Sequence, residues 1–170
     1  MIHAIRILAA GAAAALALTA CSQGASGTGE GRSSYEREDD RALGDPDAPV
    51  TLVEYASVAC GGCAAWHESA MPTVREYIEA GDVRYVFREM ITGQRNLAIA
   101  GFMLARCAPE DRYFDVIDLL FEQQRALFTA MQQGRGQAQF QTIARSVGFT
   151  DEEFRSCVQD PELLEAVQQA

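Results

Sequence analysis

Lysine is absent from the 170 residues, so all 14 basic residues are arginines. The 24 acidic residues give a formal net charge of −10, and no basic stripe or interleaved aromatic surface is present in the sequence. We therefore expect no nucleic-acid partner, and the acidic balance favours a dispersed domain. The sequence also lacks internal repeats, and its hydrophobic content of 48% is enough for a single domain with a core.

No apolar run reaches the ~20 residues that a membrane-spanning helix needs. The longest, 7–20, has 14 residues and follows the basic residue Arg6, as in the hydrophobic part of an export signal. It ends in Leu-Thr-Ala-Cys, which resembles the lipobox of bacterial lipoproteins, where the cysteine is acylated. We therefore predict a signal peptide at 1–20 and a lipid anchor at Cys21, on the periplasmic side of a bacterial membrane. The alternative is an ordinary signal cleaved after Ala20, with Cys21 incidental.

Glycine and serine dominate the residues that follow, and few large apolar groups are present. Such a segment cannot bury enough surface to order itself, so we predict a flexible tether at 21–42 and a folded domain from Leu43 onward. An exported chain lies in an oxidising compartment, where disulfides persist. With Cys21 assigned to lipid, an even number of cysteines remains, as a disulfide framework or redox couple requires. They are Cys60, Cys63, Cys107 and Cys157.

Two strands and a helix are predicted around the first of these cysteines. Residues 50–56 form a nearly continuous apolar and β-branched run, typical of a strand buried on both faces of a parallel sheet. The sequence from Cys63 has helical composition up to Gly81, and Pro72 should kink or divide this helix. The alternating segment 82–89 predicts a second strand. Together these lengths predict a right-handed parallel βαβ unit.

Cys60 and Cys63 are separated only by two glycines and follow the first predicted strand. Cys60 then lies at the N-terminus of the helix, where unpaired backbone N–H groups and the helix dipole favour the thiolate. Cys63 lies about one turn deeper and is shielded, so Cys60 is the better attacking sulfur. This asymmetry suits thiol–disulfide exchange, in which one sulfur forms the mixed disulfide and the second resolves it.

The stretch DPDAPVTLVEYASVACGGCAAWHE resembles the start of the DsbA-like disulfide oxidoreductases of the thioredoxin superfamily. The later segments VRYVFREM, FMLARCA and YFDVIDLLFEQQ resemble the helical insertion of that family. The resemblance implies an α/β, thioredoxin-like fold over 43–170, with a βαβ unit at 43–94 and a helical insertion at 95–170. It also implies a thiol–disulfide oxidoreductase without a cofactor. Its partners would be exported proteins with thiols or disulfides, and a redox partner in the membrane is a further expectation.

Glu54 matches the buried acid of that family in its spacing before the first cysteine. In that role it would relay a proton to or from the resolving thiol; the alternative is a glutamate at a strand end that faces solvent. The motif departs from that of DsbA, which has Pro-His between its cysteines and a strongly oxidising couple. Because Gly61 and Gly62 add no positive side chain near Cys60, we expect a less oxidising couple here.

His67 lies four residues after Cys63, on the same face of the predicted helix. An aromatic-His pair is frequent at this place in the family, so we expect a packing or mild electrostatic role for His67 and a core or rim position for Trp66. An alternative function is a Cu(I) or Zn carrier or chaperone that uses Cys60, Cys63 and His67. Zinc sites usually have a fourth ligand, and none is close in the sequence. A third hypothesis is a catalytically weak remnant retained as an interaction module.

The sequence from Arg95 onward predicts helices. The expected segments are 95–108, 111–133 and 137–147, a short helix after Thr150 with a capping box, and a last helix from Pro161 with Asp160 as its cap. Cys107 and Cys157 both lie in this block and are expected to form a structural disulfide; the alternative is two buried free thiols.

The DsbA-like family continues with a strand after a cis-proline, a pairing strand and a final helix. None of the five prolines of this sequence lies in such a place. The resemblance therefore predicts that the C-terminal part of the sheet is missing, which leaves two strands, either because the sequence is truncated or because a partner completes the fold. We expect the strand that carries Glu54 to have an unpaired edge, with Val50, Leu52 and Val53 partly uncovered.

Overall fold

The structure, a computed structural model, describes residues 34–169. All of these residues belong to one compact unit of the chain. The predicted signal peptide, the anchor at Cys21 and the first part of the predicted tether lie outside the described residues. Within 34–169, no helix combines the length and apolar character needed to cross a membrane.

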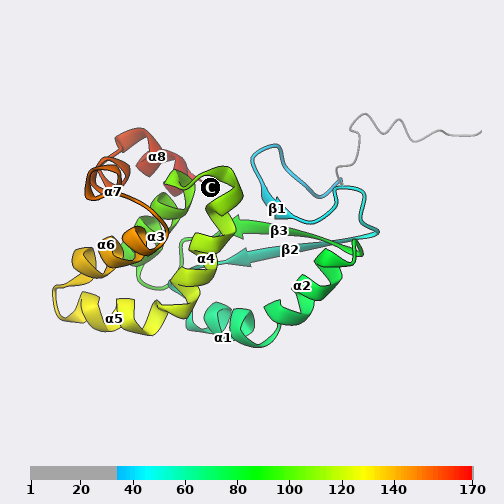
Figure 1. The fold of residues 1–170 in the computed structure, drawn as a ribbon, viewed down its shortest axis with the longest axis horizontal. Helices are drawn as coiled ribbons and strands as arrows, with labels where there is room; N and C mark the ends of the chain where they lie inside the picture. The colour runs from blue at the N-terminus through cyan, green and yellow to red at the C-terminus, as the bar shows by residue number, and fades with distance from the viewer. Residues whose placement is uncertain (1–33, 170) are drawn as a thin grey trace, which may run out of the picture. The chain divides into compact units, whose positions relative to one another are not determined.

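Three strands form the sheet of the described unit (Figure 1). They are β1 (Arg41–Leu43), β2 (Val50–Ala56) and β3 (Val83–Glu89), in the order β1-β3-β2. β2 and β3 are parallel, with Val50 opposite Val83, whereas β1 is antiparallel to β3. The predicted βαβ unit is therefore confirmed.

The expectation of a two-stranded sheet is wrong, because β1 adds a third strand to the far side of β3. Its three residues are too few to show an alternating pattern, and it begins two residues before Leu43, where we expected the domain to start. Ion pairs fix the segment before it: Glu36 pairs with Arg84 and Asp40 with Arg88, and both carboxylates are almost fully buried. Charged side chains on β3 thus hold the N-terminal part of the described chain against the sheet.

β2 has β3 on one side and no strand of the described residues on the other. Val50 and Tyr55 are 52% and 51% exposed, and Leu52 and Val53 are partly buried. The expectation of an unpaired edge is confirmed for the described part of the chain. The expectation that this strand is buried on both faces is wrong, because only Ala56 is fully buried.

Two helices, α1 (Gly61–Ser69) and α2 (Met71–Glu79), connect β2 to β3 (Figure 1). Pro72 lies in the first turn of α2, where its missing N–H leaves no intrahelical hydrogen bond unmade. It therefore divides the predicted helix into two, as its position indicated. Gly81 adopts φ 80° after α2, a left-handed conformation that suits glycine, and turns the chain into β3.

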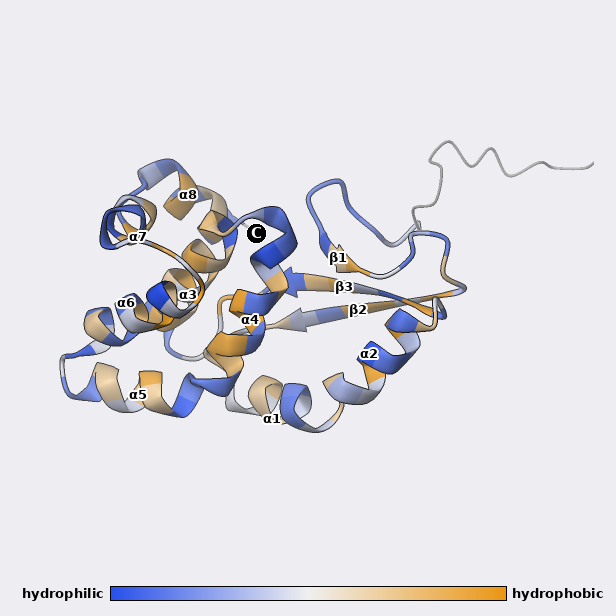
Figure 2. Cartoon of the chain, in the orientation of Figure 1, coloured by the Kyte–Doolittle hydropathy of each residue, from blue (hydrophilic) through white to orange (hydrophobic). Residues whose placement is uncertain are grey.

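The remaining helices form a block beyond the carboxyl ends of β2 and β3 (Figure 1). They are the 3-10 turn η1 (Glu110–Arg112), α3 (Arg95–Cys107), α4 (Tyr113–Glu122), α5 (Gln124–Gln132), α6 (Gly136–Ser146), α7 (Asp151–Val158) and α8 (Pro161–Gln169). The helix expected over 111–133 is divided at Gln123 into α4 and α5. Each helix of the block carries both hydrophobic and hydrophilic residues (Figure 2), as expected of helices with one buried side.

The caps of the last two helices are those that the sequence predicts. Thr150 and Glu153 form a reciprocal capping box at the start of α7. At α8 the carboxylate of Asp160 accepts hydrogen bonds from the backbone N–H groups of Glu162 and Leu163. Both arrangements satisfy N–H groups that have no partner within the helix itself.

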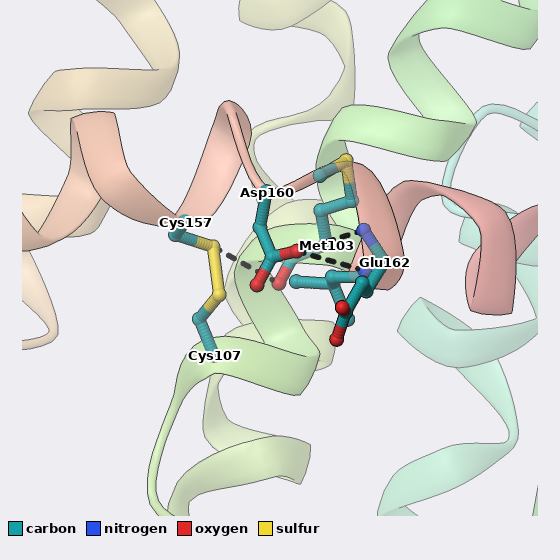
Figure 3. Close-up of a disulfide and its surroundings, with 6 residues drawn as sticks. Met103, Cys107, Cys157, Asp160 and Glu162 are labelled. Atoms are coloured by element: carbon teal, nitrogen blue, oxygen red, sulfur yellow. Dashed lines mark hydrogen bonds between the residues drawn. A yellow bond between two sulfur atoms is a disulfide. The ribbon is translucent and has the colours of Figure 1, made fainter.

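Cys107, at the end of α3, forms a disulfide with Cys157 of α7 (Figure 3), so the alternative of two free thiols does not hold in the structure. The bridge closes a separation of 50 residues, with the two Cα atoms 6.0 Å apart. Cys157 is buried, and its sulfur lies 3.3 Å from the carbonyl oxygen of Met103. The disulfide therefore joins α7 to α3, which packs against α4, α7 and α8.

Candidate active site

Cys60 is the N-cap residue of α1, and its sulfur accepts a hydrogen bond from the backbone N–H of Cys63 at 3.4 Å. Its extended backbone (φ −102°, ψ 118°) is typical of a cap and directs the side chain back over the first turn. Both cysteines are free thiols in the structure and both are partly buried. The Cys60 sulfur thus occupies the place where a helix N-terminus stabilises negative charge.

The two thiols differ in acidity. The pKa of Cys60 is lowered, chiefly by the hydrogen bond from the Cys63 thiol and then by the backbone N–H groups of Cys63 and Gly62. The pKa of Cys63 is raised, first by burial and then by its hydrogen bond to Cys60, and the charge of Glu54 raises it further. Cys60 is therefore ionised under conditions in which Cys63 keeps its proton.

Glu54 lies inside the protein, with a side chain only 14% exposed. Its Oε2 accepts a hydrogen bond from the hydroxyl of Tyr85 and lies 3.2 Å from Nε2 of His67. Burial, and then the hydrogen bond to Glu54, raises the pKa of Tyr85 well above its ordinary value, so the hydroxyl keeps its proton. The alternative of a glutamate that faces solvent is therefore wrong.

The ring of His67 is buried, with 6% of its side chain exposed. It stacks on Phe121 of α4 at a centroid distance of 4.0 Å, and partly buried Trp66 meets it edge-on. Its Nε2 faces Glu54 and its Nδ1 lies 3.8 Å from Oδ1 of Asp118. The packing role expected for His67 is observed, and of the core or rim positions expected for Trp66 the structure shows the rim, partly buried against the core.

The predicted metal ligands are not brought together as a set. In the part of the chain that the structure describes, no three His, Cys, Asp or Glu side chains form a group that could hold a metal ion. The ring nitrogens of His67 face carboxylates rather than the thiols of Cys60 and Cys63. The alternative based on these three ligands therefore has no geometric support.

The loop between β2 and α1 is fixed by residues that sequence reasoning missed. Gln124 is buried at the start of α5, and its amide donates hydrogen bonds to the carbonyl oxygens of Val58 and Cys60, at 2.9 and 3.0 Å. The buried hydroxyl of Ser57 accepts from the N–H of Ala59 and donates to the carbonyl of Thr92. Gln124 follows Cys60 by 64 residues, so only the folded chain shows that they meet.

A cavity of about 850 Å³ opens between α1 and α2 on one side and α4 and α5 on the other. His67, Arg75 and Asp118 line it, together with Gly61, the neighbour of Cys60. Arg75 forms an ion pair with Asp118, whose side chain is 32% exposed. The cavity therefore places charged groups and open space beside α1, although neither Cys60 nor Cys63 lines it.

Comparison with known proteins shows which family has this fold. A family model described as Thioredoxin matches residues 36–170. This chain belongs to the thioredoxin family. Among solved structures it resembles alpha-DsbA1 from Wolbachia pipientis, with a TM-score of 0.71 and 25% identity over 79% of this chain and 66% of that one. The fold predicted from the sequence, a DsbA-like member of the thioredoxin superfamily, is thus confirmed.

Curated relatives share the similarity over part of their length. A Rickettsia bellii protein, whose name assigns it provisionally to the protein-disulfide oxidoreductases, is 29% identical over 132 residues. The match covers 76% of this thioredoxin-family chain and 49% of the relative. Disulfide bond formation protein D of Bacillus subtilis is 33% identical over 86 residues, which are 48% of this chain and 38% of that protein. The chain therefore spans about half the length, or less, of these curated relatives.

Proposed function

We propose that this chain is a thiol–disulfide oxidoreductase that acts on exported proteins through Cys60 and Cys63. The observation that carries the proposal is the pairing of unlike thiols at the start of α1. The Cys60 sulfur caps the helix and has a lowered pKa, and the shielded Cys63 has a raised one. The names of the relatives and structural neighbours support the same class of reaction.

The exchange proceeds in two steps that move two electrons. A thiolate of the substrate attacks the Cys60 sulfur of the oxidised couple, and the Cys60–Cys63 bond breaks with Cys63 leaving as a thiolate. A second substrate thiolate then attacks the substrate sulfur of the mixed disulfide, forming the substrate disulfide and releasing Cys60. In the reverse direction the Cys60 thiolate attacks a substrate disulfide, and Cys63 resolves the product.

Glu54 handles the proton of Cys63 in this proposal. A thiol with a raised pKa must lose its proton before it can attack and must regain one after it leaves. Glu54 is the buried carboxylate whose charge acts on Cys63. It accepts the proton when Cys63 attacks and returns it when Cys63 leaves.

A trapping experiment tests the proposed reaction. Reduced Cys63→Ala protein is mixed with a model protein that contains one disulfide, and the products are separated without reductant. We expect a covalent complex through Cys60 that reductant releases, because the resolving thiol is missing. Cys60→Ala is the matched control and should give no complex, and wild-type protein should give reduced substrate instead. A folded Cys63→Ala protein that traps nothing, together with a wild type without turnover, would refute the proposal.

We also propose that the protein is exported and held at the membrane by lipid on Cys21, with the catalytic domain on the periplasmic side. The apolar run of 14 residues and the Leu-Thr-Ala-Cys ending support this. Stable anchoring needs two or more acyl chains. Expression in bacteria with a labelled fatty acid should label the wild type, and Cys21→Ala should give an unlabelled form. An unmodified mature N-terminus by mass spectrometry would contradict the anchor.

A further inference from the structure

His67 joins two carboxylates that differ in their access to solvent. Its Nε2 lies 3.2 Å from Oε2 of Glu54, whose side chain is 14% exposed. Its Nδ1 lies 3.8 Å from Oδ1 of Asp118, whose side chain is 32% exposed and lines the cavity. One imidazole therefore contacts a buried acid on one side and an acid of the cavity on the other.

The apolar surroundings of His67 restrict how the ring can act. Phe121 stacks on one face, and Phe87 and Trp66 meet it edge-on. These rings hold the imidazole in one plane with its two nitrogens directed at the two carboxylates. A ring needed only for packing would not require acceptors at both nitrogens, because an aromatic residue fills the same space.

We propose that His67 and Asp118 extend the proton path of Cys63 from Glu54 to the cavity. Cys63 would then exchange its proton with solvent from the side of α1 while a substrate covers Cys60. The inference deepens the proposed function and rests on it. His67 and Asp118 act through Glu54 rather than on the sulfur atoms, so they are positioning residues for the proton.

On the outward path, Cys63 gives its proton to Glu54, and Glu54 protonates Nε2 of His67. The proton that His67 carried on Nδ1 then passes to Asp118, and Asp118 releases this proton to solvent. The Cys63 thiolate then attacks Cys60 in the mixed disulfide, forms the Cys60–Cys63 bond and expels the substrate thiolate. The 3.8 Å between Nδ1 and Asp118 closes to hydrogen-bonding distance with a small movement of the half-exposed Asp118 side chain.

The two half-reactions together return the proton of His67 to the nitrogen on which it began. The outward transfer leaves the proton of His67 on Nε2, and the inward transfer, which protonates a departing Cys63, returns it to Nδ1. Burial raises the pKa of Asp118, against the lowering effect of Arg75, so this carboxyl takes up a proton more readily than an exposed aspartate. The titratable and charged groups that act on the path are Cys60 and Cys63 of α1, Glu54 of β2, Tyr85 of β3, Arg75 of α2, and Asp115, Asp118 and Glu122 of α4.

The test separates the attack of Cys60 from the resolution by Cys63. Reduced protein is mixed with dithiobis-nitrobenzoate, an aromatic disulfide that releases one coloured thiolate when Cys60 attacks it and a second when Cys63 resolves the adduct. The disulfide between Cys107 and Cys157 keeps these cysteines out of the reaction, and Cys21→Ala in every variant removes the remaining thiol from the count. The first release reports the proposed nucleophile, and the rate of the second reports the proton path.

Two substitutions interrupt the path and one controls for charge. His67→Gln keeps a hydrogen-bond donor for Glu54 but cannot pass a proton, and Asp118→Asn keeps the shape of the side chain. Glu68→Gln removes an exposed carboxylate of the same cavity that is not an ion-pair partner of His67. Below the pKa of Cys63 we expect the second release to slow by about 10-fold or more in the first two variants, with the first release unchanged. Glu68→Gln should match the wild type in both.

Imidazole added to His67→Ala distinguishes a lost proton path from a changed acidity of Cys63. The substitution opens space beside the cavity, so the second release should accelerate in proportion to the imidazole concentration at constant pH. A shifted pKa of Cys63 would not depend on the concentration of the buffer base. If His67→Gln does not fold, Asp118→Asn carries the comparison.

Two results would overturn the inference: a wild-type rate of the second release in His67→Gln and Asp118→Asn, or slow release in His67→Ala that imidazole leaves unchanged. Failure of the proposed function itself looks different. In that case the wild type would release only one coloured thiolate for each protein, whatever residue stands at position 67.

Discussion

The disulfide between Cys107 and Cys157 should be a major contributor to the stability of the helical block. It closes a separation of 50 residues, and on the chain-entropy model a loop of this size restricts the unfolded chain by about 4 kcal/mol. Replacing both cysteines by alanine also removes a buried sulfur at Cys157, which adds on the order of 1 kcal/mol. We therefore expect the double alanine variant to lose about 4 to 5 kcal/mol of unfolding free energy.

Urea unfolding measures this loss, provided that the redox state of the other two cysteines does not interfere. The comparison is therefore made in a background with Cys60→Ala and Cys63→Ala, with and without the substitutions at Cys107 and Cys157. The slope of free energy against urea should rise without the bridge, because the unfolded chain then exposes more surface. A loss below about 1 kcal/mol with an unchanged slope would refute the reasoning, since the bridge would then not restrict the unfolded state.

Three further predictions concern the site. Iodoacetamide should alkylate Cys60 at pH values below those for an ordinary thiol (pKa about 8.5), because the pKa of Cys60 is lowered. Cys63 should react only at higher pH, because its pKa is raised. Peptide mapping that shows equal alkylation rates for the two thiols would contradict this. Gln124→Leu should cost about 2 kcal/mol in urea unfolding, because the buried carbonyl of Val58 loses the amide donor and the carbonyl of Cys60 keeps only the N–H of Ala64; an unchanged midpoint would argue against it. Gly101→Ala should cost about 1 to 3 kcal/mol, because the new Cβ would lie 2.7 Å from Cγ2 of Val58; an unchanged melting temperature would show that the core adjusts.

Local signals in the sequence were sufficient for the βαβ unit and most of the helices. The apolar run of β2, Pro72 between α1 and α2, and the capping box at Thr150 each act within a few residues, so their effects could be predicted without the rest of the fold. The position of Cys60 as the N-cap of α1 followed from the same local reasoning. β1 was missed because three residues carry no period, and its place depends on ion pairs with β3.

The surroundings of the thiols could be predicted only in part. The spacing of Glu54 before Cys60 indicated the buried acid through the family resemblance, but its partner Tyr85 lies on another strand. Gln124 follows its partner Cys60 by 64 residues, and Asp118 follows its partner His67 by about 50 residues, so both reach α1 from distant helices. Such contacts depend on how the helical block packs on the sheet, which no local pattern encodes.

The reversible formation of a disulfide between Cys60 and Cys63 tests the central claim most directly. The protein is equilibrated in glutathione buffers of increasing oxidising strength, quenched with acid, alkylated and mapped by mass spectrometry. The account predicts one reversible transition in which two thiols become an internal disulfide between Cys60 and Cys63, without a lasting glutathione adduct. It would be contradicted if Cys60 kept a stable glutathione adduct, or if both thiols stayed reduced throughout, in a protein that remains folded.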